Sequence, residues 1–307
     1  MKGLQDLLQP ITTHPHNVYG LTAYPTFQYH HMIKKSTLMD TIGQYPTELL
    51  SLLGNSTISD TDGQRIMECI QQDRASAGSD GSVKDGIGGH AFCISDHSFT
   101  TAIWGYAQTV GTSPDMTSLR AEHGGALGIL LLIYAMHIHY QMDFPPTLTI
   151  YIDNSEVVRR GKTAVPRLGI KQQLVLDYDL WATTERIITA IPCIINWKWV
   201  KGHQAQGAGS RWRLDVALNS FCDKKAEAAR TLNSQGDPDP FFPDQKCGIT
   251  VGGIRQHGSP REAITYAAHA QALQDYITEK AGWLPDVFSR VDWTGLAGYM
   301  NTIPATR

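Results

Sequence analysis

The chain has 307 residues, enough for one large domain or two modest ones, and its 42% hydrophobic and 18% charged residues are ordinary for a folded globular protein. Five scattered cysteines without a CxxC pair argue against a disulfide framework or a zinc knuckle and favour a reducing compartment. No basic-then-apolar signal pattern opens the chain, and its longest apolar stretch, from Leu127 to Tyr134, is shorter than a membrane span. We therefore expect a soluble, intracellular protein, with nucleus and cytoplasm left open.

A net charge of −3 does not by itself indicate a nucleic-acid binder. The distribution is more informative, because lysine and arginine outnumber aspartate and glutamate only between residues 74 and 232. Neutralising some acids of this middle part with cations would make it more basic, which is compatible with a phosphate-backbone partner.

The first 73 residues read as an N-terminal extension with little core of its own. Prolines break its beginning into short pieces, and helical patterns follow over 47–53 and 62–72. Three strands are predicted next, over 75–83, 87–94 and 99–108. Because Lys84-Asp85-Gly86 is a turn signal, we expect an antiparallel meander.

The clearest helix is predicted over 115–140, with Asp115, Thr117 or Ser118 as its cap. Further elements are expected in the order strand, helix, helix, strand, helix, over 148–153, 154–160, 174–190, 193–200 and 219–230. The last helix would be capped by Asn219 or Ser220. This order predicts an α/β fold, a five-stranded mixed sheet flanked by helices, over residues 74–232.

The remaining residues, 233–307, are expected to form a C-terminal helical extension. Asp237-Pro238-Asp239-Pro240 marks a linker, and Ser259-Pro260-Arg261-Glu262 is a capping box that predicts a helix ending near Gly282.

Four carboxylates stand out among the predicted elements: Asp80, Glu122, Asp153 and Asp223. Glu122 shares a helical face with Ala126 and other apolar residues, where a carboxylate is costly unless it is paired or bound to a cation. Asp80 and Asp153 fall on strands, and Asp223 falls in the first turn of its predicted helix, where the helix dipole tolerates an anion.

If the strands of Asp80 and Asp153 are adjacent, all four acids can meet at one end of the sheet. Ligands that are all oxygen suit hard cations such as Mg²⁺ or Mn²⁺. Two such ions stabilise the attacking and leaving oxygens of an in-line displacement at phosphorus, so the pattern predicts phosphodiester hydrolysis.

Several short runs of the chain together resemble type 1 ribonuclease H. They are Ser79-Asp80-Gly81-Ser82, Ser118-Leu119-Arg120-Ala121-Glu122, Ile152-Asp153-Asn154-Ser155, Trp199-Val200-Lys201-Gly202-His203 and Cys222-Asp223. The order of strand Asp, helix Glu, strand-end Asp, loop His and helix Asp is similar to that family over roughly residues 74–232. Each motif alone is weak, but together they are specific.

The resemblance implies a ribonuclease H-like fold and cleavage of the RNA strand of RNA–DNA hybrids. Asp80, Glu122, Asp153 and Asp223 would hold two Mg²⁺ or Mn²⁺ ions, with Asp80 bridging them, and His203 would assist water activation or product release. RNA would be distinguished through its 2′-hydroxyl groups. The implied nucleic-acid contacts are Gly81, Ser82, Lys84, Ser118, Asn154 and Lys201.

The motifs resemble the ribonuclease H domain of retrotransposon polyproteins more than the free-standing enzyme. Residues 1–73 would then be a remnant of the connection to a reverse transcriptase domain, which is the implied partner in a longer parent polyprotein. Two features depart from the family pattern. The spacing between His203 and Asp223 is longer than in compact members, and few cations lie between residues 161 and 190.

Several alternatives stay open at the level of sequence. Asp215 replaces Asp223 as the fourth acid if the last helix begins earlier. His137 and His139 resemble a metal pair, but residues two apart on a helix face differently. The alternative functions are a catalytically inactive nucleic-acid-binding or structural module derived from a retroelement, and a DNA-cleaving nuclease or transposase of the same superfold.

Overall fold

The computed structural model describes a core of the chain and a few shorter segments. The described residues are 20–23, 28–111, 116–142, 145–163, 175–202, 213–232, 242, 247–251, 254–255, 269, 272, 275–280 and 282. The chain divides into two compact units, residues 1–260 and 261–307. In the second unit, residues 275–280 are helical.

The first unit is built on a six-stranded sheet with the order β2-β5-β4-β3-β6-β7. The strands are β2 (Thr57–Ile58), β3 (Ala75–Lys84), β4 (Ile87–Asp96), β5 (Ala102–Gln108), β6 (Thr147–Ile152) and β7 (Ile194–Trp199). β2 pairs antiparallel with β5, β5 with β4, and β4 with β3. β6 pairs parallel with β3, and β7 pairs parallel with β6. The mixed sheet and its meander are therefore confirmed, and β2, from the N-terminal region, is a sixth strand where five were predicted.

A smaller three-stranded sheet has the order β1-β8-β9. It joins β1 (Gly20–Ala23) antiparallel to β8 (Cys247–Val251), which pairs with β9 (Ile254–Arg255). Segments from the two ends of the chain thus lie side by side.

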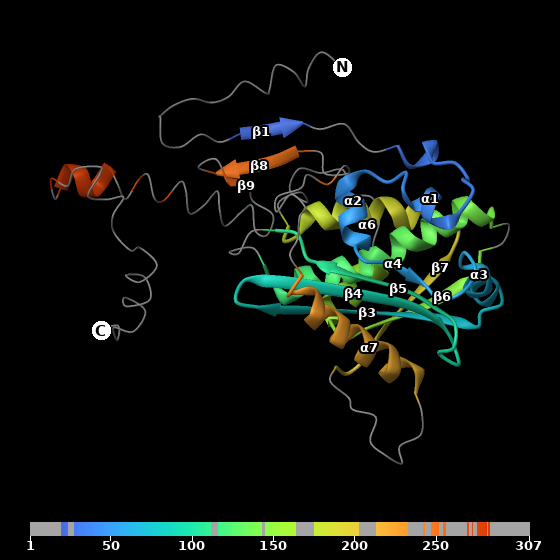
Figure 1. Cartoon of the computed structure of the whole chain (residues 1–307). Coiled ribbons are helices and arrows are strands. Elements are labelled where there is room, and N and C mark those ends of the chain that lie inside the picture. The colour runs from blue at the N-terminus through green and yellow to red at the C-terminus, as the bar shows by residue number, and fades with distance from the viewer. Residues whose placement is uncertain are drawn as a thin grey trace. The chain divides into compact units, whose positions relative to one another are not determined.

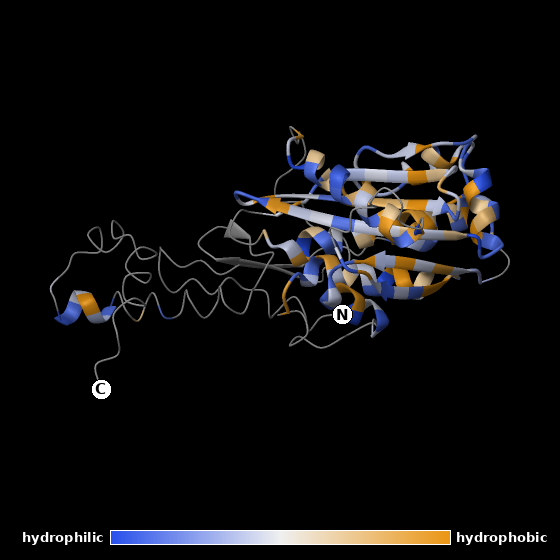
Figure 2. Ribbon diagram, turned by 90° about the horizontal axis from the view of Figure 1, so that it is seen from below, coloured by the Kyte–Doolittle hydropathy of each residue, from blue (hydrophilic) through white to orange (hydrophobic). Residues whose placement is uncertain are grey.

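Helices cover both faces of the large sheet (Figure 1). They are α1 (Leu38–Ile42), α2 (Thr47–Leu53), α3 (Gln64–Gln71), α4 (Ser118–Tyr140), α5 (Ser155–Lys162), α6 (Tyr178–Ala190) and α7 (Leu214–Ala229), with a short 3₁₀ turn at Tyr29–His31. α7 packs on one face, where Gly78 meets Leu218. α4 packs on the other, where its Gly125 lies against Ser79 and Ala91. Hydrophobic residues, orange in Figure 2, recur along the helices that pack on the sheet.

Helix α4 is the centre of the core. The Thr117 side chain caps it by accepting a hydrogen bond from the Arg120 amide, as the sequence predicts. By length and composition the helix is apolar enough to cross a membrane, but 89% of its apolar window is buried inside the protein. It is therefore the core helix of this fold.

The N-terminal helices share that core. Leu38, Leu49 and Ile66 are fully buried in the same hydrophobic cluster as Leu131 of α4. The Tyr45 hydroxyl donates a hydrogen bond to the Leu131 carbonyl at 2.7 Å. These helices cover a side of α4 that the sheet does not, and the domain boundary at residue 73 remains a proposal.

The last helix of the first unit corrects one prediction. α7 begins at Leu214 and not at Asn219 or Ser220, and Asn219 is buried in its middle. Leu218, Cys222 and Ala226 recur every four residues from before the expected cap onward, and their burial outweighs the capping signal. Asp223 therefore lies deep in the helix and not in its first turn.

Two smaller differences concern boundaries. β5 begins at Ala102 because Phe99 has a φ of 59°, which belongs to the turn after β4. α6 begins at Tyr178, after the expected start. Residues 203–212 and most of the helix predicted after Ser259 lie outside the described residues.

Candidate metal centre

Asp80 lies in the second half of β3, on the face of the sheet that α7 covers. Side chains alternate along a strand, and Gly78, two residues earlier, meets Leu218 of α7. The Asp80 side chain is only 4% exposed, and its Oδ1 accepts a hydrogen bond from the Gly81 amide at 2.8 Å. The carboxylate is thus held in a nearly closed environment.

Gly81 allows β3 to approach α4 closely. A Cβ at this position would lie 2.3 Å from the Glu122 amide nitrogen and 2.5 Å from the Ala121 carbonyl carbon. Real Cβ atoms do not approach other atoms this closely, so any larger residue would push the strand and the helix apart. The absence of a side chain at Gly81 therefore brings Glu122 beside Asp80.

Asp153 directly follows β6. Because β3 and β6 run parallel, with Gly78 opposite Tyr151, Asp153 reaches the same edge of the sheet as Asp80. Trp199 Nε1 donates to the Asp153 carbonyl at 2.9 Å. A Cβ on Gly202 would lie 2.3 Å from Asp153 Oδ2, so the chain leaving β7 passes against this carboxylate.

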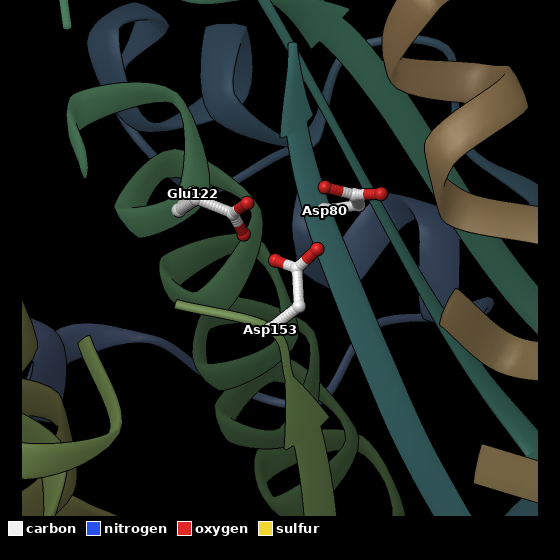
Figure 3. A group of neighbouring side chains, drawn as sticks. All are labelled: Asp80, Glu122 and Asp153. Atoms are coloured by element: carbon white, nitrogen blue, oxygen red, sulfur yellow. The ribbon is translucent and has the colours of Figure 1, made fainter. Parts of the chain in front are cut away.

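The three acids meet (Figure 3). One ligand oxygen from each of Asp80, Glu122 and Asp153 lies within 4.8 Å of the other two. Asp80 and Glu122 are each 4% exposed, and Asp153 is half-buried. Residues that lie 42 and 31 positions apart along the chain are thus placed to share one ligand.

Burial and mutual repulsion make this group costly when it is charged. Burial and the charge of Asp153 raise the pKa of Asp80 to about 7. Burial and the charge of Asp80 raise the pKa of Glu122 well above its usual range. The two shifts have the same origin, because burial and the charges of neighbouring acids raise both pKa values.

The donor set fits a hard divalent cation. All three ligands offer oxygen, which Mg²⁺ and Mn²⁺ prefer. Among the described residues, Glu122 Oε2 is buried without a hydrogen-bond partner. Buried polar atoms are rarely left without a partner, and a bound cation would supply one to this oxygen.

Asp223 lies near the three-acid group on α7. It is half-buried, and its charge contributes to the raised pKa of Asp80. Asp215, the alternative fourth acid, pairs with Arg213 and acts on Tyr151 instead. The helix begins early enough to include Asp215, so α7 carries both candidates for the fourth acid.

The other residues suggested by the sequence are spread around this group. His203 lies outside the described residues. Gly81 and Ser82 are half-buried in β3, while Lys84, Ser118 and Lys201 are exposed. Asn154 has a structural task, since its Oδ1 accepts hydrogen bonds from the Glu156 and Val157 amides and caps α5.

The histidine pair and the tryptophans behave as structural residues. His139 contacts Thr41 and Asp62 at 3.1 Å each, while His137 points elsewhere, in contact with the ring of Tyr134. Trp197 is buried against Gly161 and Trp199 is 55% exposed, which agrees with the alternation expected along β7.

One buried residue of the motif received no role from the sequence. Arg120 is fully buried and forms ion pairs with Asp177 and Asp179 of the α6 start. An arginine inside an otherwise apolar helical stretch is a signal for a buried partner, but the sequence does not say which acid supplies it.

The chain is similar in sequence to a bacterial protein of known type. It is 30% identical over 116 residues to the ribonuclease H of Verminephrobacter eiseniae (strain EF01-2), a match that spans 34% of this chain and 73% of the bacterial protein. No sequence profile of a known protein family matches the chain.

Solved structures of similar type were also found. The N-terminal RNase H domain of Rv2228c from Mycobacterium tuberculosis has 14% identity and a TM-score of 0.35, covering 51% of this chain and 92% of its own. LC11-RNase H1 in complex with an RNA/DNA hybrid has 12% identity and a TM-score of 0.35, covering 50% and 95%. RNase H1 of Halobacterium salinarum NRC-1 has 15% identity and a TM-score of 0.33, covering 51% and 96%. At TM-scores this low, the structural similarities carry no conclusion about this chain.

Proposed function

The chain belongs to the ribonuclease H family, and from this premise we propose that it hydrolyses the RNA strand of RNA–DNA hybrids with two divalent metal ions. The family relationship supports nuclease activity, and the hybrid substrate and the two-ion mechanism are our proposals. The observation that carries them is the convergence of Asp80, Glu122 and Asp153, with one buried Glu122 oxygen that lacks a partner among the described residues.

The three carboxylates and Asp223 would hold Mg²⁺ or Mn²⁺. When bound, the ions would stabilise the negative charge on the attacking and leaving oxygens of phosphodiester hydrolysis. The chain's own task is to bring like charges together and keep them there. Gly202 passes against Asp153, and His203, which lies outside the described residues, is proposed from the sequence motif alone to assist water activation or product release.

The hybrid would lie across the exposed residues around this group. Lys84, Ser118 and Lys201 are exposed near the elements that carry the acids, and Gly81 and Ser82 offer backbone groups from β3. These residues are proposed to contact the sugar–phosphate backbones, where 2′-hydroxyl groups distinguish RNA from DNA. Asn154 would contribute to this contact while its side chain continues to cap α5.

The wider context of the domain is a further proposal, supported by sequence motifs alone. The ribonuclease H domain would span residues 74–232, with residues 1–73 as a remnant of the connection to a reverse transcriptase and residues 233–307 as a C-terminal extension. The Ser118–Glu122 run and the Leu218-Asn219 pair support a retrotransposon polyprotein as its origin. An intracellular location follows from that proposal.

The central experiment compares three labelled duplexes: an RNA–DNA hybrid, double-stranded RNA and double-stranded DNA. Each is incubated with the full chain in Mg²⁺ or in chelator, and products are resolved by length. We expect cleavage of the RNA strand of the hybrid alone, and only with the metal. Equal cleavage of all three duplexes would contradict the proposed substrate, and absence of cleavage would favour an inactive binding module.

A matched pair of variants tests the fourth acid. Asp223→Asn and Asp215→Asn make the same chemical change at two positions of α7. We expect the first to reduce hybrid cleavage by about a hundredfold or more and the second to change it little, because only Asp223 acts on Asp80. The reverse ranking would assign the fourth ligand to Asp215.

A further inference from the structure

Arg120 anchors the first turn of α4, two residues before Glu122. Its Nη1 donates to Asp177 Oδ1 at 3.0 Å and to Asp179 Oδ1 at 2.9 Å, and its Nη2 donates to Asp179 Oδ2 at 2.6 Å. Its Nε donates to the Val110 carbonyl at 2.7 Å. A fork of donors with fixed geometry, buried on all sides, holds the start of the helix in one orientation.

The residue after Glu122 is attached to the same part of α6. His123 Nε2 lies 2.8 Å from Thr184 Oγ1, and the His123 ring lies on the Trp181 ring with a centroid distance of 4.3 Å. His123 is only 2% exposed. Contacts on both sides of Glu122 along the chain therefore lead to α6.

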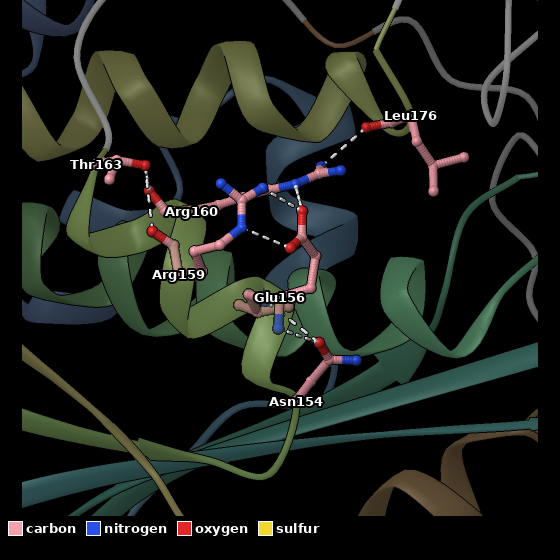
Figure 4. Close-up of polar contacts among 7 residues, drawn as sticks. Asn154, Glu156, Arg159, Arg160, Thr163 and Leu176 are labelled. Carbon is pink, nitrogen blue, oxygen red and sulfur yellow. Dashed lines mark hydrogen bonds and ion pairs between the residues drawn. The ribbon is translucent and has the colours of Figure 1, made fainter.

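The helix that follows Asp153 leads there as well (Figure 4). Arg160 of α5 donates from Nη1 to the Leu176 carbonyl at 3.0 Å, and its guanidinium lies 5.5 Å from the centre of the Trp181 ring. Arg160 also pairs with Glu156, in the first turn of α5. The first turn of α5, directly after Asp153, is thus connected through Arg160 to Leu176 and to Trp181 of α6.

We propose that residues 176–181, which we call the α6 buttress, are a positioning element of the metal centre. The buttress holds Glu122 through Arg120 and His123, and it holds Asp153 through Arg160. The contacts of Arg120, His123 and Arg160 described above are with residues other than the three acids, so the buttress would act through the backbone of α4 and α5. The inference deepens the proposed function and depends on it only in that the three carboxylates bind a divalent ion.

The physical reason is repulsion. Asp80, Glu122 and Asp153 carry like charges within 4.8 Å of one another when ionised, and they would move apart without a restraint. Metal ligands must stay within roughly 0.5 Å of their productive positions. An element that ties the helices of two ligands to one rigid point meets this requirement.

Binding of Mn²⁺ alone, followed by the electron paramagnetic resonance signal of the free ion, tests the buttress independently of cleavage. Arg120→Lys keeps the charge but loses the fork, and Asp179→Asn keeps the shape but loses the charge. We expect each to raise the Kd for Mn²⁺ by about tenfold, the effect typical of residues that orient metal ligands. Tyr45→Phe is the control, because it removes another buried hydrogen bond to α4, at Leu131, far along the helix from Glu122.

The control separates positioning from general stability. We expect Tyr45→Phe to lower the Tm and leave the Kd unchanged. Kd values within about twofold of wild type in both buttress variants would overturn the proposal, and so would a wild-type protein that binds no Mn²⁺. A wild-type protein that binds Mn²⁺ but does not cut the hybrid would contradict the proposed function and leave the buttress to be judged by the Kd values.

Discussion

Two groups of buried acids lie next to the first turn of α4, and they differ in the charged groups that surround them. Asp177 and Asp179 share the guanidinium of Arg120, a cation supplied by the chain itself. Burial raises the pKa of Asp177 to about 6, but the charge of Arg120 opposes that rise. At the metal centre the surrounding charges add to the effect of burial, so the pKa of Asp80 reaches about 7.

The difference shows how a structural ion pair is distinguished from a site. Both groups are buried and both contain carboxylates, so burial alone does not separate them. The charged neighbours do: Arg120 pairs with both acids of the α6 group, although Asp177 Oδ2 has no hydrogen-bond partner among the described residues, whereas the charges that raise the pKa of Asp80 and Glu122 come from other acids. Similar acids on neighbouring elements therefore have opposite consequences for stability and for activity.

The largest expected effect appears when the same change, aspartate to asparagine, is made separately in each group. Asp80→Asn should reduce hybrid cleavage by roughly 10⁴-fold, about 5 kcal/mol in activation free energy, because it removes a central ligand. Asp179→Asn should retain most cleavage at saturating Mg²⁺. Single-turnover cleavage rates measure both, and equal losses would remove the distinction between the groups.

The second effect is on stability. Arg120→Met leaves Asp177 and Asp179 buried without their cation, and the free energy of unfolding should fall by about 4 kcal/mol. Urea unfolding measures the change at constant m-value. Arg159→Met is the control, because Arg159 is 65% exposed in its pair with Glu156, and solvent screening should make its loss much smaller. Similar losses in both variants would show that the buried pair has no special weight.

The third effect is a pH dependence in the absence of metal. The folded-state pKa of Asp80, about 7, lies above its ordinary value of 3.8. Stability from the neutral carboxyl is therefore fully present below about pH 4 and is lost as the pH rises through 7. Measured in chelator, the wild type should lose stability relative to Asp80→Asn over this window, by a few kcal/mol at most at about 1.4 kcal/mol per pKa unit.

Comparing the wild type with Asp80→Asn cancels an opposing effect of pH on stability, which comes from two buried histidines. Burial lowers the pKa of His90 to about 4 and that of His123 to about 3, so both stay neutral in the folded state and destabilise it as the pH falls. Both histidines are present in the wild type and in Asp80→Asn, and their contributions cancel in the difference. A difference that does not change with pH would contradict the raised pKa.

The smallest effect concerns the buried Glu122 oxygen without a partner. Glu122→Gln should stabilise the metal-free protein by about 1 to 2 kcal/mol at neutral pH, because the amide, unlike the carboxyl, needs no proton from solution to stay neutral in this buried site. Added Mg²⁺ should stabilise the wild type and not the variant, since only the wild type binds it well. Thermal unfolding in chelator and in Mg²⁺ measures both shifts. A variant that is less stable than wild type in chelator would argue against an uncompensated site.

The sequence predicts the elements of the sheet because strand alternation, turns and helix caps are local signals. Thr117 caps α4, as one of the three expected candidates, and the strand of Asp153 does lie beside that of Asp80. The α7 start was misjudged because Asn219 looks like a cap while its neighbours already continue an apolar face. β2 has only two residues and no pattern to detect.

Long-range partners were beyond the reach of sequence patterns. Arg120 meets acids 57 and 59 positions away, and nothing local indicates either one. The contact at Gly81 was equally hidden, since a glycine after an aspartate also suits an ordinary turn. Such features depend on which elements pack together, and that emerges only from the folded chain.

Helix α4 has no water-facing side along most of its length, because the sheet, α6 and the helices before residue 73 each cover part of it. A shortened protein made of residues 74–232 would expose the apolar surface that α1 and α2 normally shield. Such a surface favours self-association, and any movement it causes in α4 would reach Glu122, which the helix carries. A domain boundary drawn from motif similarity alone would thus give a protein that self-associates and in which Glu122 is displaced. Inactivity of that shortened protein would say nothing about the intact chain.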